Sequence, residues 1–311
     1  MADEVKNSIS RGSIEVCRIM VPDDANIAGN VHGGTTLKVI EEAGYIIATR
    51  HCNKTRSSPN THYNAALARV ERTDFLQPVY IGEVVQVHAE LGYASKHSLE
   101  VTVCVWAENL VTGSRRLTNR ASLWYVPYDV VQSRDGKTVI GEVPPVDTLN
   151  DVDMEKGKAR YESQKRARLE KQELLKKFPC NCTVNHCMAS HVEGEEAPIH
   201  CVAASQSSFI HFVQPSECGE HGFLYGGVLM KMMDDLAGTV AYRHCKTNVV
   251  TASIGSCYRA CSAFFTFVSL DTNHRPQAIP AIDLQTDDER QRFEEGKKRY
   301  EERKQRRLSH S

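Results

Sequence analysis

The sequence predicts an α+β protein in which an antiparallel sheet wraps around a central helix, and it predicts that this unit occurs twice. The main observation is an internal repeat. The stretch from Gly33 to Cys52 recurs from Gly226 to Cys245 with the same glycine pair, an acidic pair at the same place and the same Arg-His-Cys ending. The offset between the copies is constant at 226 − 33 = 193 residues. Repetition at a fixed spacing indicates a duplicated structural unit.

The stretch after the first glycine pair has the periodicity of a helix. Apolar or small residues recur at intervals of 3, 4 and 3 positions, at Leu37, Ile40, Gly44 and Ile47. These intervals place the four residues on one face of an α-helix. Ala43 and Ala48 lie on or beside that face, and small residues there let a sheet approach closely. The sequence therefore predicts a central helix that the sheet surrounds.

Strands are predicted on both sides of this helix. Residues 14–20 read as a short strand that ends in a turn at residues 22–26. Downstream, apolar residues at positions 99, 101, 103 and 105 alternate with other residues, which is the period of a strand with one buried face. Residues 112–114 form a turn, and residues 121–126 supply a further strand. This order of elements predicts an antiparallel sheet.

The second copy is shorter than the first. Its helix keeps the apolar stripe, but Val126 aligns with Val268 at an offset of 142, so the copy lacks 193 − 142 = 51 residues. Most of the missing length corresponds to residues 71–117, which hold the middle strands of the first sheet. We therefore predict a second unit that lacks its middle strands and has little sheet of its own around its helix.

The predicted organisation is a first domain at residues 12–178, a linker at 179–205 and a second domain at 206–309. Each domain ends in a charged segment that is predicted to be helical, and the segments share a Gly-x2-Arg-Tyr pattern that begins at Gly157 and Gly296. A solvated surface is the favoured interpretation of these segments. A subunit contact or a contact to an anionic ligand is the alternative.

Composition restricts the class of protein. A chain of 311 residues, with 41% hydrophobic and 25% charged residues, is long enough for two globular domains. A net charge of −1 lacks the basic excess that nucleic-acid binding requires. The N-terminus has no apolar stretch typical of a secretion signal, and no run is long enough to insert into a membrane. We therefore expect a cytoplasmic protein.

The eleven cysteines are expected to be free thiols, because they are scattered and odd in number. Residues 180–201 combine cysteines with histidines, which are ligand types that zinc uses. Their spacing matches none of the usual zinc patterns, so no metal site is expected there.

The acidic pair in each copy locates the candidate chemistry. Glu41 and Asp234 lie mid-helix beside the apolar stripe, where partial desolvation raises the pKa of a carboxyl and makes it a usable base. An ordinary carboxylate at the edge of a core is the alternative. If the two helices pack as pseudo-twofold mates, one cleft combines Asn26 with Asp234 and the other combines Glu41 with Gly219. Only the first cleft has both a base and an amide.

The glycine pairs supply a third element. Gly33 and Gly34 open the first helix, as Gly226 and Gly227 open the second, and the unpaired N–H groups at a helix N-terminus stabilise a developing oxyanion. A helix N-terminus, a carboxylate and an amide together predict hydrolysis of an activated acyl group by water. His32 is expected to be structural, because its counterpart in the second copy is a tyrosine.

These motifs resemble those of the tandem hotdog-fold acyl-CoA thioesterases. The resemblance covers nearly the whole chain outside the linker, and it rests on residues 22–26, 29–34, 66–75, 117–127, 205–208, 221–223 and 244–253. It implies a double hotdog fold and hydrolysis of long-chain acyl-CoA to fatty acid and CoA, without a cofactor and without the mechanism of a serine esterase. It implies Asn26 and Asp234 as the catalytic pair, with Glu41 and Gly219 in a second, inactive cleft. It also implies a homo-oligomer of three chains, with six hotdog units.

Two other functions remain open from the sequence. The missing strands are compatible with an impaired acyl-CoA-binding protein or oligomer subunit that lacks turnover. The second alternative is a hotdog hydratase or dehydratase that acts on acyl thioesters. Such an enzyme needs a histidine with an acidic partner, and His32 with Asp234 offers that pair.

Overall fold

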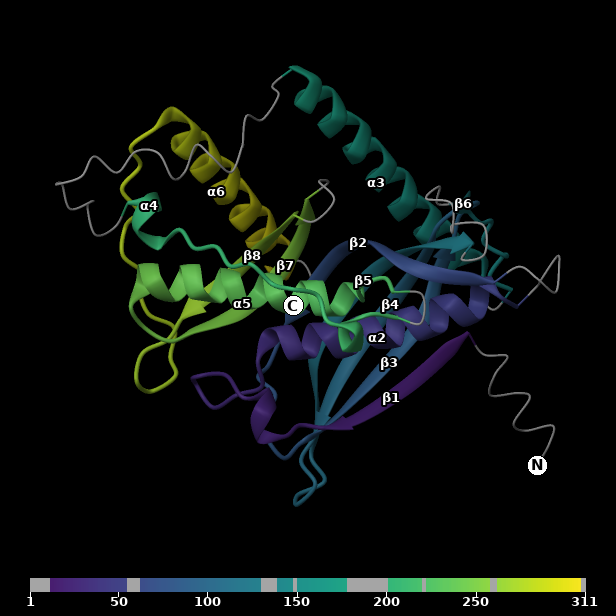
Figure 1. The fold of residues 1–311 in the computed structure, drawn as a ribbon, viewed down its shortest axis with the longest axis horizontal. Coiled ribbons are helices and arrows are strands. Elements are labelled where there is room, and N and C mark those ends of the chain that lie inside the picture. Colours follow the sequence, from purple (N-terminus) through teal and green to yellow (C-terminus); the bar gives the residue numbers. More distant parts are fainter. Residues whose placement is uncertain are drawn as a thin grey trace.

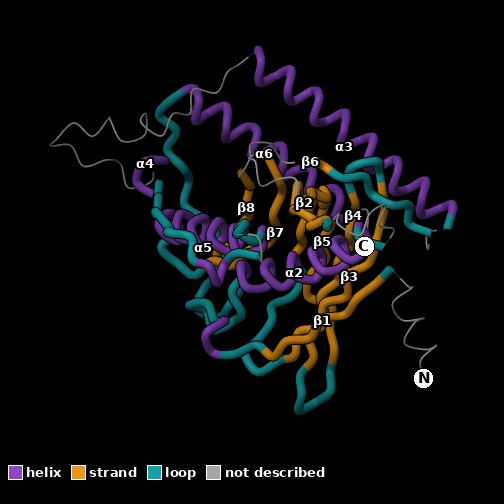
Figure 2. Tube along the Cα trace, turned by 45° about the vertical axis from the view of Figure 1, so that its right-hand side comes forward, coloured by secondary structure: helices purple, strands orange, loops and turns teal. Residues whose placement is uncertain are grey.

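The structure is a computed structural model that describes residues 12–54, 62–129, 139–147, 150–177, 201–219, 222–257 and 262–308. Figure 1 shows two helices, α2 (Gly33–Cys52) and α5 (Gly226–Cys245), side by side in front of a single antiparallel sheet. Figure 2, turned from that view, shows part of the sheet between these helices and two further ones, α3 (Asp151–Lys177) and α6 (Asp287–Leu308). The predicted α+β class is confirmed.

All pairs of neighbouring strands in the sheet are antiparallel, and their order is β1-β3-β4-β5-β2-β7-β8, with β6 beside β5. The strands are β1 (Ser13–Ile19), β2 (Tyr63–Phe75), β3 (Val84–Ala94), β4 (Leu99–Glu108), β5 (Arg115–Asp129), β6 (Val139–Ile140), β7 (Val249–Cys257) and β8 (Ser262–Ser269). Short helical turns are η1 (Pro22–Asp24), α4 (Val202–Ser205) and η4 (Pro215–Glu217).

Helix α2 is the centre of the core, as predicted. The stripe residues Leu37, Ile40 and Ile47 are buried against the inner side chains of the sheet. The hydroxyl of Tyr125 in β5 donates to the backbone oxygen of Glu41, and the same ring lies so close to Gly44 that a methyl group there would collide with it. A glycine at this position therefore permits the close approach of helix and sheet.

The second unit joins the same sheet. Strand β7 pairs with β2 through Arg72, Thr73 and Asp74, and β8 pairs along the other edge of β7. Four strands of the wrapped part of the sheet, β2 to β5, follow α2 in the chain. Among the described residues, the strands that follow α5 are β7 and β8. Helix α5 is accordingly less enclosed than α2. Its buried residues are Gly227, Val228, Met230 and Asp234.

The charged helix α3 is anchored to the outer face of the sheet at one place. Gly157 lies against Tyr93, and Arg160 donates two hydrogen bonds of 2.8 Å to the fully buried Glu100. Tyr161 stacks on Tyr93, with ring centroids 5.9 Å apart. Most other described side chains of α3 are exposed, as a solvated surface requires.

Some sequence predictions lie outside the described residues. Residues 178–200, which include most of the linker and most of the cysteine- and histidine-containing segment, are among these. Within the part of the chain that is described, no group of three or more potential ligands is arranged to hold a metal ion. In that same part, no helix is both long enough and apolar enough to cross a membrane.

Candidate active site

The mid-helix carboxylate of each central helix lies at the N-terminus of the other. A Cβ atom added to Gly33 would lie 2.9 Å from Oδ2 of Asp234, and one added to Gly227 would lie 3.1 Å from Oε2 of Glu41. The glycine pairs therefore admit the carboxylates close to the first turn of each helix. The structure brings Gly33 together with Asp234, and Gly226 and Gly227 together with Glu41, while Gly34 faces Lys231.

Glu41 is already bonded to the helix that it faces. Its Oε2 atom accepts a hydrogen bond of 3.0 Å from the backbone N–H of Gly227, and the residue is only 3% exposed. Burial raises the pKa of the Glu41 carboxyl to about 7, and the Gly227 hydrogen bond offsets part of that increase. This carboxyl therefore changes charge near neutral pH.

Asp234 is fully buried and differs from Glu41 in its bonding. The Thr251 hydroxyl donates to Oδ1 over 2.8 Å. Among the described residues, no donor is aligned for a hydrogen bond with Oδ2, although Nδ1 of His32 lies 3.2 Å away. One oxygen of Asp234 is thus held in place while the other faces the N-terminus of α2 without a well-formed bond.

His32 is the N-cap of α2 and lies between two carboxylates. Its Nδ1 atom accepts from the Gly34 N–H over 3.1 Å, and its Nε2 atom lies 3.3 Å from Oδ1 of Asp235. The nearby Asp234 carboxylate raises the pKa of the imidazole, and burial opposes that increase. Nδ1 is able either to accept from Gly34 or to donate to Asp234, but not both at once, so the two contacts belong to different protonation states.

Asn26 lies in the loop before α2. Its side-chain oxygen accepts hydrogen bonds from the N–H groups of Ala28 at 2.9 Å and Asn30 at 3.1 Å. Both bonds use the oxygen, so the NH2 group is the part of the side chain that remains available as a donor. The fourth candidate of the two clefts, Gly219, lies near the ring of Tyr225 and has no direct contact with Glu41 in the structure as described.

A cavity of about 950 Å³ extends from this site between the two units. Its volume is at the upper end of the range for ligand pockets, which is roughly 300–1,000 Å³. The first unit lines it with Asn26, His32, Gly33, Phe75, residues 76–80 and Asn119. The second unit lines it with Asp235, Gly238, Thr239, Tyr242, residues 248–252, Phe267 and Val268, among others.

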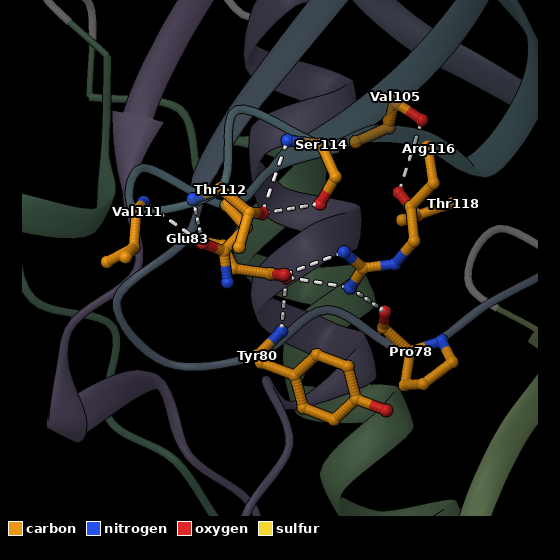
Figure 3. Close-up of polar contacts among 10 residues, drawn as sticks. Pro78, Tyr80, Glu83, Val105, Val111, Thr112, Ser114, Arg116 and Thr118 are labelled. Carbon is orange, nitrogen blue, oxygen red and sulfur yellow. Dashed lines mark hydrogen bonds and ion pairs between the residues drawn. The ribbon is translucent and has the colours of Figure 1, made fainter.

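An ion pair holds one wall of the cavity. Arg116 binds both carboxylate oxygens of Glu83, at 2.6 and 2.8 Å, and also donates to the backbone oxygen of Pro78 (Figure 3). The N–H of Tyr80 donates to the same carboxylate. Burial alone would raise the pKa of the Glu83 carboxyl, but the hydrogen bonds from Arg116 and Tyr80 lower it below its usual value. Pro78 and Tyr80 line the cavity, so the pair fixes its shape.

From the sequence alone, Thr251 and Asp235 had no assigned role, and His32 had a chemical role only in the hydratase alternative, as the partner of Asp234. Thr251 belongs to β7, and nothing in its local pattern marks it. Its meeting with Asp234 depends on the packing of α5 against the sheet. For His32, the acidic pair on the facing helix was an available signal, but only three-dimensional packing brings the pair to the histidine.

Known proteins are similar to this chain in sequence. The thioesterase superfamily model matches residues 28–114 and 221–261. Cytosolic acyl coenzyme A thioester hydrolases of Mus musculus and Homo sapiens are each 45% identical over 94% of this chain and 84% of their own length. An apo-hexameric acyl-CoA thioesterase of known structure is 26% identical and covers 51% of this chain and 95% of its own, with a TM-score of 0.42.

A central helix wrapped by an antiparallel sheet, together with the match to the thioesterase superfamily model, is the arrangement of a hotdog-fold protein of the thioesterase class. The extent of the sequence identity makes the assignment more specific. The chain belongs to the family of cytosolic acyl-CoA thioester hydrolases. The predicted family and the predicted class of enzyme are therefore confirmed.

Proposed function

We propose that this protein hydrolyses long-chain acyl-CoA to a free fatty acid and CoA in one composite cleft that both units complete. The observation that carries the proposal is the buried Oδ2 atom of Asp234, which faces Gly33 without an aligned hydrogen-bond donor among the described residues. A buried carboxylate oxygen without a donor destabilises the fold. It is the arrangement expected where a water molecule binds and gives up a proton.

The N-terminus of α2 is the proposed site for the thioester carbonyl. The first N–H groups of a helix have no acceptor within it, so they are available to an oxygen that gains negative charge. The Gly34 N–H donates to His32 in the structure, and in the proposed reaction it donates to the carbonyl oxygen instead. A hydrogen bond that is stronger in the transition state than in the ground state raises kcat.

Asp234 takes a proton from the attacking water while the water oxygen bonds to the thioester carbon. The carbon–sulfur bond then breaks, its electron pair leaves with the sulfur, and the CoA thiolate takes the proton from Asp234. The fatty acid is released and ionises in water. Thr251 keeps the carboxylate in position through its 2.8 Å hydrogen bond, and the NH2 group of Asn26 orients the water or the carbonyl.

The second cleft is proposed to be inactive. The Gly227 N–H, which corresponds to that of Gly34, is already bonded to Glu41 and is not free for a carbonyl. Position 219 offers a glycine where the competent cleft has Asn26, so an orienting amide is also missing from this position. One competent site per chain follows from both differences.

The cavity lining supports a long acyl chain. Apolar or small side chains of the second unit, including Gly238, Val250 and Phe267, contribute a wall along which a hydrocarbon chain is able to lie. A cytosolic location agrees with the names of the related hydrolases. We also propose assembly of three chains into a particle with six hotdog units. Light scattering of the purified protein tests that number.

The direct test is release of free thiol from palmitoyl-CoA. Asp234→Ala and Asn26→Ala are each expected to lower kcat by about a hundredfold or more, which is the size of effect that loss of an essential acid–base or oxyanion group produces. Glu41→Ala is the matched control, because it removes the equivalent carboxylate from the other cleft. Equal loss of activity in Glu41→Ala and Asp234→Ala would contradict the assignment of a single competent cleft.

The same assay separates the alternative functions. A protein that binds acyl-CoA without turnover would release no thiol in the parent enzyme. A hydratase would depend on His32 rather than Asn26, so His32→Ala would abolish activity and Asn26→Ala would not. The relatives, which are named as thioester hydrolases, do not favour the hydratase.

A further inference from the structure

Asn119 is a buried amide for which the fold supplies no partner. It lies in β5, is 1% exposed and contributes to the cavity wall. Neither its side-chain nitrogen nor its side-chain oxygen has a hydrogen-bond partner among the described residues. Buried polar side chains are nearly always hydrogen-bonded, because an unpaired one loses its contacts with water and gains none in return. An exception in a cavity wall indicates that a ligand completes the bonding.

The strand geometry directs this amide toward the site. Side chains along a strand alternate between the two faces, so residue 119 shares a face with residue 125. Tyr125 points at α2, since its hydroxyl donates to the backbone oxygen of Glu41. Asn119 therefore lies on the concave face that holds α2. Its cross-strand partners are Phe75 and Val105, and Phe75 also lines the cavity.

The two sides of the cavity differ in chemistry. The first unit contributes four side-chain amides to the lining, those of Asn26, Asn30, Gln77 and Asn119, whereas the second unit contributes one, that of Asn248. The second unit contributes side chains such as Val250 and Phe267, which suit a hydrocarbon chain. An acyl-CoA has the same division, because the acyl chain is apolar and the thiol arm carries two secondary amides. A carboxamide has both donors and an acceptor, so it is able to pair with the N–H or the C=O of such an amide.

We propose that Asn119 is a specificity-determining residue that hydrogen-bonds an amide of the thiol arm of the acyl-CoA substrate. The inference rests on the proposed function, since it assumes that the cavity holds an acyl thioester. It adds a binding contact that is separate from the catalytic pair. The contact selects thioesters whose thiol arm carries an amide over simple thioesters with an equal acyl chain.

The test compares three octanoyl thioesters with the parent enzyme and Asn119→Leu. Octanoyl-CoA has two amides in its thiol arm, the N-acetylcysteamine ester has only the amide nearest the sulfur, and the 2-mercaptoethanol ester has none. Asn119→Leu is expected to raise KM for octanoyl-CoA about tenfold, which is the loss of one good hydrogen bond. It is expected to leave KM for the 2-mercaptoethanol ester unchanged. The N-acetylcysteamine ester then identifies which of the two amides makes the contact.

Thermal unfolding separates this role from a structural one. A leucine removes both unpaired polar atoms from the core, so the Tm of Asn119→Leu is expected to equal or exceed that of the parent enzyme. Thr118→Val is the matched control. It removes a buried hydroxyl on the same strand that donates to Val105 over 3.1 Å, so it should lower Tm without changing KM.

Equal increases in KM for all three esters, no increase for any of them, or a fall in Tm for Asn119→Leu would each overturn the proposal. Thiol release by the parent enzyme reports separately on the proposed function. If the parent enzyme hydrolyses none of the esters, the hydrolase assignment fails. In that case, calorimetric dissociation constants for the same three esters, measured with the parent protein and with Asn119→Leu, decide the role of Asn119.

Discussion

The Glu41 carboxylate accepts a 3.0 Å hydrogen bond from the N–H of Gly227, whereas the equivalent N–H of Gly34 donates to the side chain of His32. The two glycines are equivalent in the repeat because 227 − 34 = 193. In one cleft the carboxylate itself caps the facing helix. In the other a histidine caps it, and Oδ2 of Asp234 is left without an aligned donor among the described residues. This difference makes the two clefts chemically unequal.

The raised pKa of Glu41 predicts a pH-dependent stability. Its carboxyl has a pKa of about 7 in the folded protein against 4.5 in the unfolded chain, so the folded state holds the proton more tightly. Stability is then greatest below pH 4.5 and declines as the pH rises to 7, by about 3 kcal/mol for a shift of this size. Glu41→Gln should remove this decline in urea unfolding. Parallel pH profiles for the parent protein and the variant would contradict the prediction.

The raised pKa of His32 predicts a second decline in stability, at higher pH than the one from Glu41. Its pKa is raised above 6.5 by Asp234, with smaller contributions from Asp235, while burial and Lys231 oppose the increase. The imidazolium therefore stabilises the fold fully below pH 6.5 and loses that effect as the pH rises through the higher folded pKa. His32→Gln should reduce the decline in unfolding free energy above pH 6.5 to the part that Glu41 causes, and it should leave the decline between pH 4.5 and 6.5 unchanged. A profile for His32→Gln that still declines above pH 6.5 as the parent does would refute this.

Thr251 predicts a positioning effect on the base. Its hydroxyl donates to Oδ1 of Asp234, and a hydrogen bond to a charged group contributes about 1.5–3 kcal/mol. Thr251→Val keeps the shape of the side chain and should lower kcat about tenfold to a hundredfold, with little change in KM. Thr251→Ser keeps the hydroxyl and should recover most of the activity. If the serine variant is as slow as the valine variant, the hydrogen bond is not the cause.

The sequence predicted most of the first unit because its signals are local. The stripe at Leu37, Ile40 and Ile47 and the glycine pair depend only on neighbours along the chain. The internal repeat added long-range information, since it aligned Asn26 with Gly219 and selected Asp234 as the partner of Asn26. The repeat did not show which glycine pair faces which carboxylate.

The rest depends on contacts between distant segments. Thr251 reaches Asp234 only because β7 joins β2, and no local pattern encodes that pairing. Asn119 is an ordinary polar residue in a strand pattern, and only the packed core shows that its amide is buried without a partner. A residue such as Asn119, which stands out because its buried amide has no hydrogen-bond partner among the described residues, is therefore hard to predict from sequence.

The charged helices offer a matched pair of stability predictions. Arg160 of α3 is bonded to the fully buried Glu100, whereas the equivalent Arg299 of α6 lies over the ring of Phe264 at 3.9 Å. Arg160→Leu leaves the buried Glu100 carboxylate with the Ser122 hydroxyl but without a cation, and should cost about 3 kcal/mol in chemical unfolding. Arg299→Leu loses an exposed cation–π contact and should cost less than about 1 kcal/mol. Similar losses for the two variants would show that the pair with Glu100 does not anchor α3.

The glycine that faces Asp234 offers the sharpest test of the composite cleft. A methyl group at Gly33 would lie 2.7 Å from the Thr251 hydroxyl and 2.9 Å from Oδ2 of Asp234. Both neighbours are held by their mutual hydrogen bond, so Gly33→Ala must displace the carboxylate. A displacement near 1 Å costs about a hundredfold in rate. Alanine is a better helix former than glycine, so the Tm of the variant should fall little.

Gly226→Ala is the control for this substitution, because it adds the same methyl group at the equivalent position of α5. That methyl group would lie 2.9 Å from Cδ2 and 3.0 Å from Cβ of Leu67 and 3.4 Å from Oε1 of Glu41, so it disturbs the second cleft rather than the surroundings of Asp234. Thiol release from palmitoyl-CoA should therefore persist in Gly226→Ala and be lost in Gly33→Ala. The reverse result would place the competent cleft at the N-terminus of α5, with Glu41 as its base.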